Sequence, residues 1–229
     1  EITTSEKAFE VARNRGEQLK DLGISINFSP VVEVDVEKTS FIKKQTRSFK
    51  ENHSQLSRSM VQGYAASGII PVPKHFPGGL GRVSLDPHSK LPSVSLTTSE
   101  LTADLANFKT VIESGVEAVM VTHLLYSQID LVPASASKHF IKSILREELG
   151  FEGVVVVDDL SMGAVKTVSS VPEYAVLSIE AGADLLIISE TPLYQETYEA
   201  LLQKAKESRE FSTQLDASVE RVLRLKSLL

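Results

Sequence analysis

Acidic and imidazole side chains stand where predicted β-strands of this chain end. Asp158 and Asp159 follow a run of four valines, and His75 and His123 close two other short apolar segments. The carboxyl ends of parallel strands form the active face of α/β folds, so these side chains are candidates for one site. From spacing alone, the two adjacent carboxylates are equally consistent with a polar stop at the end of a buried strand.

A carboxylate and an imidazole also lie close together in the loop after the second predicted strand. Asp86 stands two residues before His88, and Gly78, Gly79 and Gly81 precede them. An Asp at this spacing can accept the ring proton of the His, which fixes the tautomer and raises the basicity of the ring. The glycines permit a mobile loop. The default interpretation of the pair in isolation is a solvated loop.

The same side chains are potential metal ligands. Neither His-x-x-x-His nor His-Glu-x-x-His occurs, and the chain has no cysteine, so the sequence specifies no metal. A magnesium or zinc hydrolase is therefore the alternative that the residues alone leave open. Arg47 is a surface cation by default, or a ligand clamp if its loop folds over the site. The potential metal ligands are His75, His88, His123, Asp86, Asp158 and Asp159.

Helical and strand-like segments alternate along the chain. The pattern predicts strands in the first half of 24–35 and over 69–76, 118–125, 153–157 and 184–188. It predicts helices over about 3–22, 52–67, 98–114, 137–149, 172–181, 193–208 and 215–229, with Thr98 or Ser99 capping the third. Five strands, each followed by a helix, indicate an α/β fold with parallel pairing, either an open doubly wound sheet or part of a (β/α)8 barrel. No glycine-rich nucleotide-binding motif supports the doubly wound alternative.

Composition narrows the classes of partner. The 229 residues, 42% of them hydrophobic, suffice for one domain or at most two. A net charge of -6 with dispersed basic residues argues against nucleic acid, and no apolar run reaches the roughly 18 to 20 residues of a membrane-spanning helix. The chain begins at Glu1 without Met or a leader, so we expect processing or a fragment. Cytoplasmic and secreted or cell-envelope locations stay open, as does the oligomeric state.

Several segments, taken in order, resemble glycoside hydrolase family 3 and its bacterial β-N-acetylglucosaminidase branch. The family's Lys-His-Phe-Pro-Gly segment is present at 74–78, its Asp-x-His…Leu-Pro segment at 86–92, and its Asp-Asp-Leu-x-Met element at 158–162. Weaker matches are Asn27-Phe28-Ser29-Pro30-Val31, Arg47-Ser48-Phe49, the strand that ends in His123, and the tail from Leu215 to Lys226. Each match is modest, but the ordered set is specific and covers the chain from end to end.

The resemblance implies a fold and an activity. The fold would be a (β/α)8 TIM barrel of which about the last five βα units are present. Residues 1–229 would then be a partial family 3 catalytic domain that lacks its first strands. The activity would be that of a retaining exo-β-N-acetylhexosaminidase acting on terminal β-linked N-acetylglucosamine in glycans or muropeptides, as in bacterial peptidoglycan turnover. The resemblance implies no metal and no organic cofactor.

It also implies catalytic roles. Asp158 would be the nucleophile that forms a covalent glycosyl-enzyme, and His88, tuned by Asp86, would be the acid and base. Imidazole suits both tasks because its unperturbed pKa of about 6.5 lies near neutrality. Asp159 is expected to brace the strand end. The loop of His88 is expected to close over the sugar before the proton is delivered.

The remaining matched residues would hold the sugar. Arg47, Lys74 and His75 correspond to family residues that bind its hydroxyl and acetamido groups, whereas His123 would line or support the pocket. Hydrogen bonds from such residues to the sugar can strengthen as the sugar ring distorts toward the transition state. The carbohydrate is the only partner that the resemblance implies.

The chain also departs from the family pattern. Gly79-Leu80-Gly81-Arg82 stands where the family usually continues His-Gly-Asp-Thr, Glu33 replaces an Asp, and Val157 replaces a Ser. The family's Asp-Gln-Glu-Gly-Gly segment has no counterpart and would lie before Glu1. Two alternatives stay open: a family 3 β-glucosidase or broader hexosidase, and a non-catalytic sugar-binding relative or inactive fragment.

Overall fold

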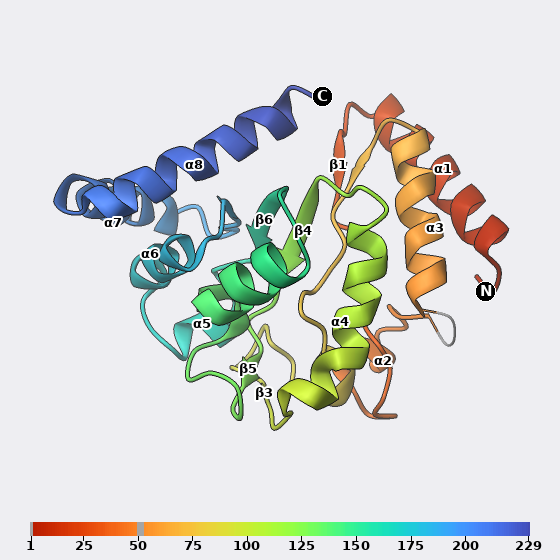
Figure 1. Cartoon of the computed structure of the whole chain (residues 1–229), viewed down its shortest axis with the longest axis horizontal. Helices are drawn as coiled ribbons and strands as arrows, with labels where there is room; N and C mark the ends of the chain where they lie inside the picture. The colour runs from red at the N-terminus through yellow and green to blue at the C-terminus, as the bar shows by residue number, and fades with distance from the viewer. Residues whose placement is uncertain (1, 50–52) are drawn as a thin grey trace. The chain divides into compact units, whose positions relative to one another are not determined.

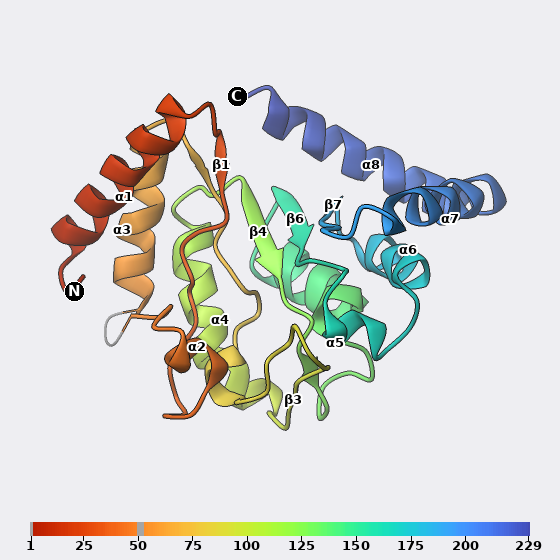
Figure 2. The same cartoon turned by 180° about the vertical axis from the view of Figure 1, so that it is seen from behind.

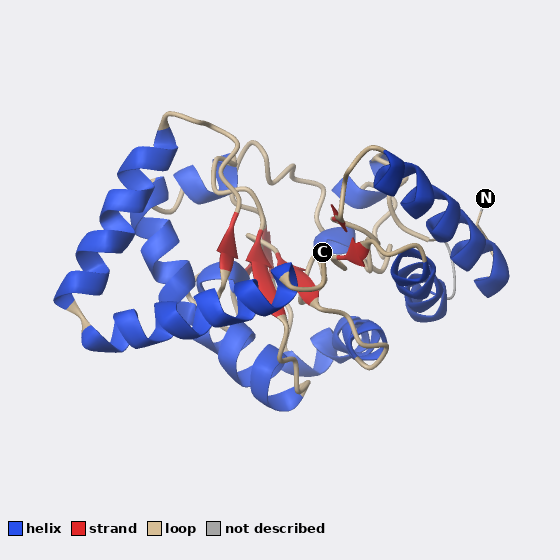
Figure 3. Cartoon of the chain, turned by 90° about the horizontal axis from the view of Figure 1, so that it is seen from above, coloured by secondary structure: helices blue, strands red, loops and turns tan. Residues whose placement is uncertain are grey.

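The chain forms a mixed α/β structure of short strands and longer helices. The structure is a computed structural model that describes residues 2–49 and 53–229. The chain divides into two compact units, which we call unit 1 (residues 1–84 and 97–120) and unit 2 (residues 85–96 and 121–229). Figure 3 shows by colour that the strands are short and that helices and loops make up most of the chain.

Unit 1 is mainly helical, with one pair of parallel strands. Ile26 of β1 lies opposite Ile70 of β2. Unit 1 ends at Met120, within the buried strand β4. The elements of unit 1, in chain order, are α1 (Ser5–Asp21), β1 (Ile26–Asn27), α2 (Phe41–Lys44), α3 (His53–Ala66), β2 (Ile70–Pro71), η1 (Leu80–Arg82), α4 (Thr98–Ile112) and β4 (Ala118–Val121).

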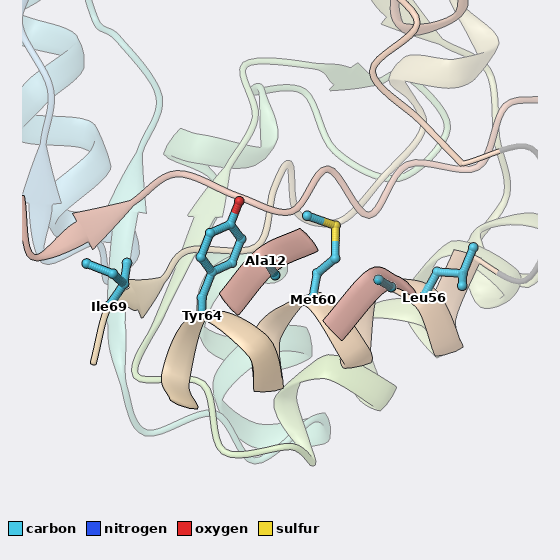
Figure 4. Close-up of a cluster of buried hydrophobic side chains, with 6 residues drawn as sticks. Ala12, Leu56, Met60, Tyr64 and Ile69 are labelled. Atoms are coloured by element: carbon cyan, nitrogen blue, oxygen red, sulfur yellow. The ribbon is translucent and has the colours of Figure 1, made fainter. Parts of the chain in front are cut away.

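The core of unit 1 lies between α1 and α3, which run side by side in Figure 1. Small residues on α1 let α3 approach closely: a Cβ added to Gly63 would lie 2.9 Å from the Cβ of Ala12 and would collide with the carbonyl oxygen of Phe9. Larger side chains fill the remaining space (Figure 4). The cluster consists of Ala8, Ala12, Leu56, Met60, Tyr64 and Ile69.

Unit 2 contains two pairs of parallel strands. Ser93 of β3 lies opposite Leu125 of β5, and Val156 of β6 lies opposite Leu185 of β7. Figure 2 shows α6, α7 and α8 gathered in the C-terminal part of the unit. The elements of unit 2 are β3 (Ser93–Val94), β5 (Leu125–Tyr126), η2 (Ala134–Ala136), η3 (His139–Glu148), β6 (Val154–Val157), α5 (Gly163–Lys166), α6 (Val171–Ala181), β7 (Leu185–Leu186), α7 (Leu193–Glu207) and α8 (Arg209–Lys226).

Strand β6 is anchored at its start by a buried carboxylate. All four of its valines are buried, as expected for a parallel strand covered on both faces. Asp184 accepts hydrogen bonds from the Val155 amide at 2.8 Å, from Arg146 at 2.6 Å and from Arg221 at 2.9 Å. The two guanidinium groups balance the charge of a carboxylate that has no exposed surface. The far end of β6, which leads to Asp158, is therefore built on a fixed start.

The predicted alternation and the parallel pairing are confirmed, whereas several predicted bounds were wrong. The strand predicted over 118–125 is two strands, β4 and β5, separated by residues 122–124. The last helix begins at Arg209 rather than at Leu215, because Ser208 accepts from the Phe211 amide at 3.2 Å and caps it. Residue 52, where a helix was predicted to start, lies outside the described residues.

The cap of α4 was also predicted at the wrong residue. Thr97, rather than Thr98 or Ser99, precedes the helix, and its hydroxyl accepts from the Glu100 amide at 3.3 Å. The Glu100 carboxylate accepts in return from the Thr97 amide at 2.8 Å, which completes a capping box. Within residues 2–49 and 53–229, no helix is both long and apolar enough to span a membrane.

Candidate active site

Asp158 stands directly after β6. Its amide donates to the carbonyl of Val121 at 3.2 Å, which continues the strand-like hydrogen bonding by one residue. One carboxylate oxygen accepts from the amide of Asp159 at 2.9 Å, and the residue is half-buried. The main chain therefore fixes both the backbone and one carboxylate oxygen of Asp158.

Asp159 braces the same strand end, as the sequence predicted. Its carboxylate accepts from the Ser161 amide at 2.9 Å, from the Ser189 amide at 3.0 Å and from the Ser189 hydroxyl. Partial burial acts to raise the pKa of Asp159, but these hydrogen bonds outweigh it and lower the pKa. Asp159 thus ties the end of β6 to the segment that follows β7, and its carboxylate is engaged in structure.

His123 holds the backbone beneath both carboxylates. Its Nε2 lies 3.1 Å from the carbonyl oxygen of Asp158 and 3.2 Å from that of Asp159. Because carbonyl oxygens only accept, Nε2 carries the ring proton and Nδ1 accepts from Ser135, whose Oγ is 2.7 Å away. The hydroxyl of Tyr174, 2.8 Å from Ser135, then donates to that Oγ.

This chain of hydrogen bonds is buried and neutral. Burial lowers the pKa of His123, although Asp158, Asp159 and their carbonyl groups act to raise it. Burial raises the pKa of Tyr174, whose ring also packs edge-on against His123 at 5.5 Å between centroids. Sequence reasoning placed His123 at the strand end but missed Ser135 and Tyr174. His123, Ser135 and Tyr174 lie in separate segments of the chain, so no sequence spacing predicts their contact.

Asp86 and His88 form the pair that their spacing predicts. Asp86 Oδ1 lies 2.7 Å from the ring Nδ1 of His88 and accepts from the His88 amide at 2.9 Å. Partial burial acts to raise the pKa of Asp86, but the hydrogen bonds from His88 outweigh it and lower the pKa. Holding the proton on Nδ1 leaves Nε2 as the ring atom that can take up or deliver a proton.

The loop that carries His88 contacts the segment that follows Asp158 and Asp159. The Gly163 amide donates to the His88 carbonyl at 2.9 Å, and the Ala164 amide donates to the Pro87 carbonyl at 3.0 Å. Unit 2 therefore contains all three predicted catalytic residues, Asp86, His88 and Asp158, and connects the segments that carry them.

Lys74 and His75 lie in unit 1, where a buried acid organises their loop. Glu33 accepts from the His75 amide at 3.4 Å and from the Leu80 amide at 3.1 Å, and it lies 3.3 Å from the His75 ring Nδ1. Lys74 Nζ lies 5.9 Å from the ring centroid of Phe28, within the range of a cation–π contact. Sequence reasoning noted Glu33 only as a departure from the family. An acid directly after two valines was the only sequence signal for this structural role.

The segment that departs from the family pattern is fastened to α4. Arg82 pairs with Asp104 at 3.0 Å, and the carbonyl of Gly81 accepts from the Val36 amide at 3.2 Å. Burial raises the pKa of Asp104 to about 6, although Arg82 acts to lower it. Arg82 thus supplies a partly buried ion pair that the sequence did not predict.

Arg47 also belongs to unit 1, on a segment held by Asp35. The buried Asp35 carboxylate accepts from the hydroxyls of Ser40 at 3.1 Å and Ser48 at 3.0 Å, and it pairs with Lys43 at 3.0 Å. The Arg47 amide donates to the Ile42 carbonyl at 3.3 Å. The three predicted sugar-binding residues therefore share unit 1, each on a segment that a buried carboxylate or a main-chain bond holds in place.

No three His, Asp or Glu side chains gather as a metal site among the residues that the structure describes. The sequence model of the glycosyl hydrolase family 3 N-terminal domain matches residues 1–225. The chain belongs to this family. The predicted family is thus confirmed over nearly the whole of the sequence.

Relatives of this family 3 chain carry hexosaminidase names. It is 36% identical over 189 residues to a beta-hexosaminidase of Neisseria gonorrhoeae, an alignment that covers 81% of the chain and 52% of the relative. It is 31% identical over 192 residues to a beta-hexosaminidase of Methylobacillus flagellatus, covering 81% and 55%. The family 3 chain therefore spans about half the length of these curated relatives.

Solved family structures share the fold of the chain. A family 3 beta-N-acetylglucosaminidase from Paenibacillus sp. str. FPU-7 matches with a TM-score of 0.92 and 34% identity, over 98% of this chain and 44% of that one. A beta-N-acetylhexosaminidase from Beutenbergia cavernae matches with a TM-score of 0.92 and 32% identity, over 98% and 69%. The family 3 chain thus has the mixed α/β fold of these N-terminal domains.

Proposed function

We propose that this chain is part of a retaining exo-β-N-acetylhexosaminidase that removes terminal β-linked N-acetylglucosamine from glycans or muropeptides. The observation that carries the proposal is the Asp86–His88 pair, held at 2.7 Å in the same compact unit as Asp158. A carboxylate nucleophile and a separate acid and base are what a retaining mechanism needs. The hexosaminidase names of the relatives support the choice of sugar.

We infer that residues 1–229 belong to a (β/α)8 barrel and supply about its last five βα units. Parallel pairing of β1 with β2, of β3 with β5 and of β6 with β7 supports this inference. So does the family match over residues 1–225. In such a barrel the carboxyl ends of the strands carry the catalytic groups, and Asp158 follows β6 directly.

The first chemical step transfers the sugar to Asp158. The carboxylate of Asp158 attacks the anomeric carbon while His88 Nε2–H protonates the departing glycosidic oxygen. The C–O bond to the leaving group breaks as the bond to Asp158 forms, which gives a covalent glycosyl-enzyme. The imidazolium that begins this step is stabilised by Asp86, which accepts its Nδ1–H.

The second step reverses these roles. His88, now neutral at Nε2, takes a proton from water as the water oxygen attacks the anomeric carbon and Asp158 leaves. Two inversions at one carbon retain the configuration. Arg47, Lys74 and His75 would hold the hydroxyl and acetamido groups of the sugar. These contacts would accelerate the reaction to the extent that they are stronger in the transition state than in the bound substrate.

Replacing the nucleophile tests the first role. In the full-length protein, Asp158→Asn should lower kcat on an aryl N-acetylglucosaminide by about 1,000-fold or more, because an amide cannot form the glycosyl ester. Mass mapping of wild-type protein treated with a slowly released fluorinated N-acetylglucosaminide should find the label on Asp158. Asp159→Asn is the control. Asp159 itself should carry no label, so this variant should still be labelled on Asp158. A label on another residue would refute the assignment.

Removing the imidazole tests the second role. His88→Ala should lower kcat/KM by about 100-fold or more for substrates with poor, sugar-like leaving groups. For aryl glycosides with good leaving groups it should lower kcat/KM much less. The reason is that only a poor leaving group needs a proton as it departs. An equal loss on both substrate classes would contradict the role of His88 as the acid.

Comparing two sugars tests the choice of substrate. Wild-type protein should cleave an aryl N-acetylglucosaminide far faster than the matched aryl glucoside. A preference for the glucoside would favour a family 3 glucosidase, and binding of either sugar without cleavage would favour a non-catalytic relative.

A further inference from the structure

The loop that carries His88 supplies the missing caps of α5. The amides of Gly163 and Ala164 begin that helix, so neither has a carbonyl partner in a preceding helical turn. Met162, the residue before them, provides no side-chain cap. The carbonyls of His88 and Pro87 accept these two amides instead, at 2.9 and 3.0 Å. The start of α5 and the loop are thus hydrogen-bonded through the main chain alone.

Gly163 is the position at which the two segments come closest. A Cβ added there would lie 2.5 Å from the carbonyl carbon of Ser89 and 2.7 Å from the carbonyl oxygen of His88. Both neighbours are backbone atoms, which cannot swing aside as a flexible side chain can. Any residue other than glycine at position 163 therefore has to push the loop and the start of α5 apart.

The loop is braced so that a displacement carries the imidazole with it. Asp86 holds both the amide and the ring of His88. The carbonyl of Asp86 accepts from the Ser89 amide at 3.0 Å and from the Ser89 hydroxyl at 2.8 Å. With these bonds in place, the ring of His88 moves together with the backbone at positions 88 and 89.

The other side of the contact is tied to the nucleophile. Gly163 follows Asp158 by five positions along the chain, and hydrogen bonds fasten the four residues between them. Leu160 is fully buried and its amide donates to Ile187 at 2.9 Å, while the Met162 amide donates to Asp159 at 3.1 Å. The position of Gly163 relative to Asp158 is therefore set by local structure.

We propose that Gly163 is a positioning residue, whose lack of a side chain lets the His88 loop dock on α5 and so sets the place of the acid relative to Asp158. This inference rests on the proposed function, because the acid role of His88 belongs to it. Docking would matter wherever His88 transfers a proton: to the leaving group in the first step and from water in the second. The value of kcat/KM reports the first step, so for leaving groups that depart unaided it would not depend on docking.

A steric substitution with a matched control tests the proposal in the full-length protein. Gly163→Ala places a methyl group against the loop, and Gly63→Ala places one against the backbone of α1, where Phe9 and Ala12 close off the space. The readout is kcat/KM for aryl N-acetylglucosaminides whose leaving groups range from good to poor. Gly163→Ala should lose about 100-fold on the poorest leaving group and less than about 5-fold on the best, which is the pattern of a lost acid. Gly63→Ala should keep the wild-type slope.

A double variant sharpens the result. If Gly163 acts through His88, then Gly163→Ala added to His88→Ala should cause no further loss on poor leaving groups, since coupled residues are not additive. A Gly163→Ala protein with wild-type dependence on the leaving group would overturn the proposal. So would an equal loss on every substrate.

Amide hydrogen exchange tests the contact without any variant. Wild-type Gly163 should be protected because its amide donates to His88, and exchange at the rate of a free amide would overturn the proposal even if Gly163→Ala failed to fold. If wild-type protein cleaved no substrate while Gly163 remained protected, the proposed function would fail and the docking would stand.

Discussion

His123 satisfies two carbonyl groups and one hydroxyl with a single buried ring, and each contact fixes the place of a proton. The carbonyls belong to Asp158 and Asp159, so the ring acts on the backbone that carries the candidate nucleophile. A neutral ring is required, because a second ring proton would remove the acceptor that Ser135 uses. The lowered pKa of His123 agrees with that requirement.

A graded pair of variants tests this role of His123. His123→Phe removes the donor to the carbonyls of Asp158 and Asp159 and one of the two partners of the Ser135 hydroxyl, so we expect about 2–4 kcal/mol less stability and a fall in kcat of at least about 10-fold. Tyr174→Phe removes only the far end of the chain of hydrogen bonds and should remove about 1 kcal/mol, with kcat within about 3-fold of wild type. Urea unfolding and steady-state kinetics measure both effects. Wild-type kcat in a folded His123→Phe protein would contradict the role.

The residues of the candidate site differ in how far the sequence could predict them. Asp86 and His88 are two positions apart, and their contact needs no information beyond the local chain. The contact of Gly163 with the same loop joins residues far apart in the sequence, and a glycine in a helix start gives no sign of it. Local spacing therefore predicted the contact between Asp86 and His88, while the docking of their loop against Gly163 depended on tertiary structure.

Among the elements, helix ends were more predictable than strands. Caps act within one turn, and the helix predicted over 172–181 is α6, Val171–Ala181, with Ser170 and Gly182 as its caps. Strands depend on their partners: the segment 118–125 was predicted as one strand, yet only residues 118–121 and 125–126 are strand. Pairing with β3 decides where β5 lies, and no local signal predicts that pairing.

Capping also explains why the start of α8, at Arg209, lies six residues before the predicted start at Leu215. The turn that opens α8 has Phe211 as its only buried residue, so the apolar pattern becomes visible only later. Ser208 nevertheless caps the Phe211 amide. A cap is a single side chain, whereas periodicity needs several turns before it can be recognised.

At the scale of the whole molecule, the buried Asp104 should make stability depend on pH. Its pKa is about 6 in the folded chain against 3.8 as its ordinary value. Between these values the folded state keeps a proton that the unfolded state has lost, so the free energy of unfolding falls as pH rises, by at most about 1.4 kcal/mol per pH unit. Below the window the contribution of Asp104 is at its most favourable, and above it the contribution is constant.

Comparison with a variant isolates this contribution. Asp104→Asn stays uncharged, so the difference in unfolding free energy between wild type and variant should decline from pH 4 to pH 6 and level off above. Urea denaturation at unit steps of pH measures the difference. A difference that rises over this range would show that the Arg82 ion pair outweighs burial.

The two units interleave along the chain, since residues 85–96 belong to unit 2 while residues 97–120 return to unit 1. During synthesis the loop with Asp86 and His88 leaves the ribosome well before Gly163 and Ala164, whose amides bind it. The loop therefore stays undocked while residues 97–120 of unit 1 and the segment up to α5 are being made. The candidate acid becomes positioned only after the candidate nucleophile has emerged, so the order of translation delays assembly of the candidate site.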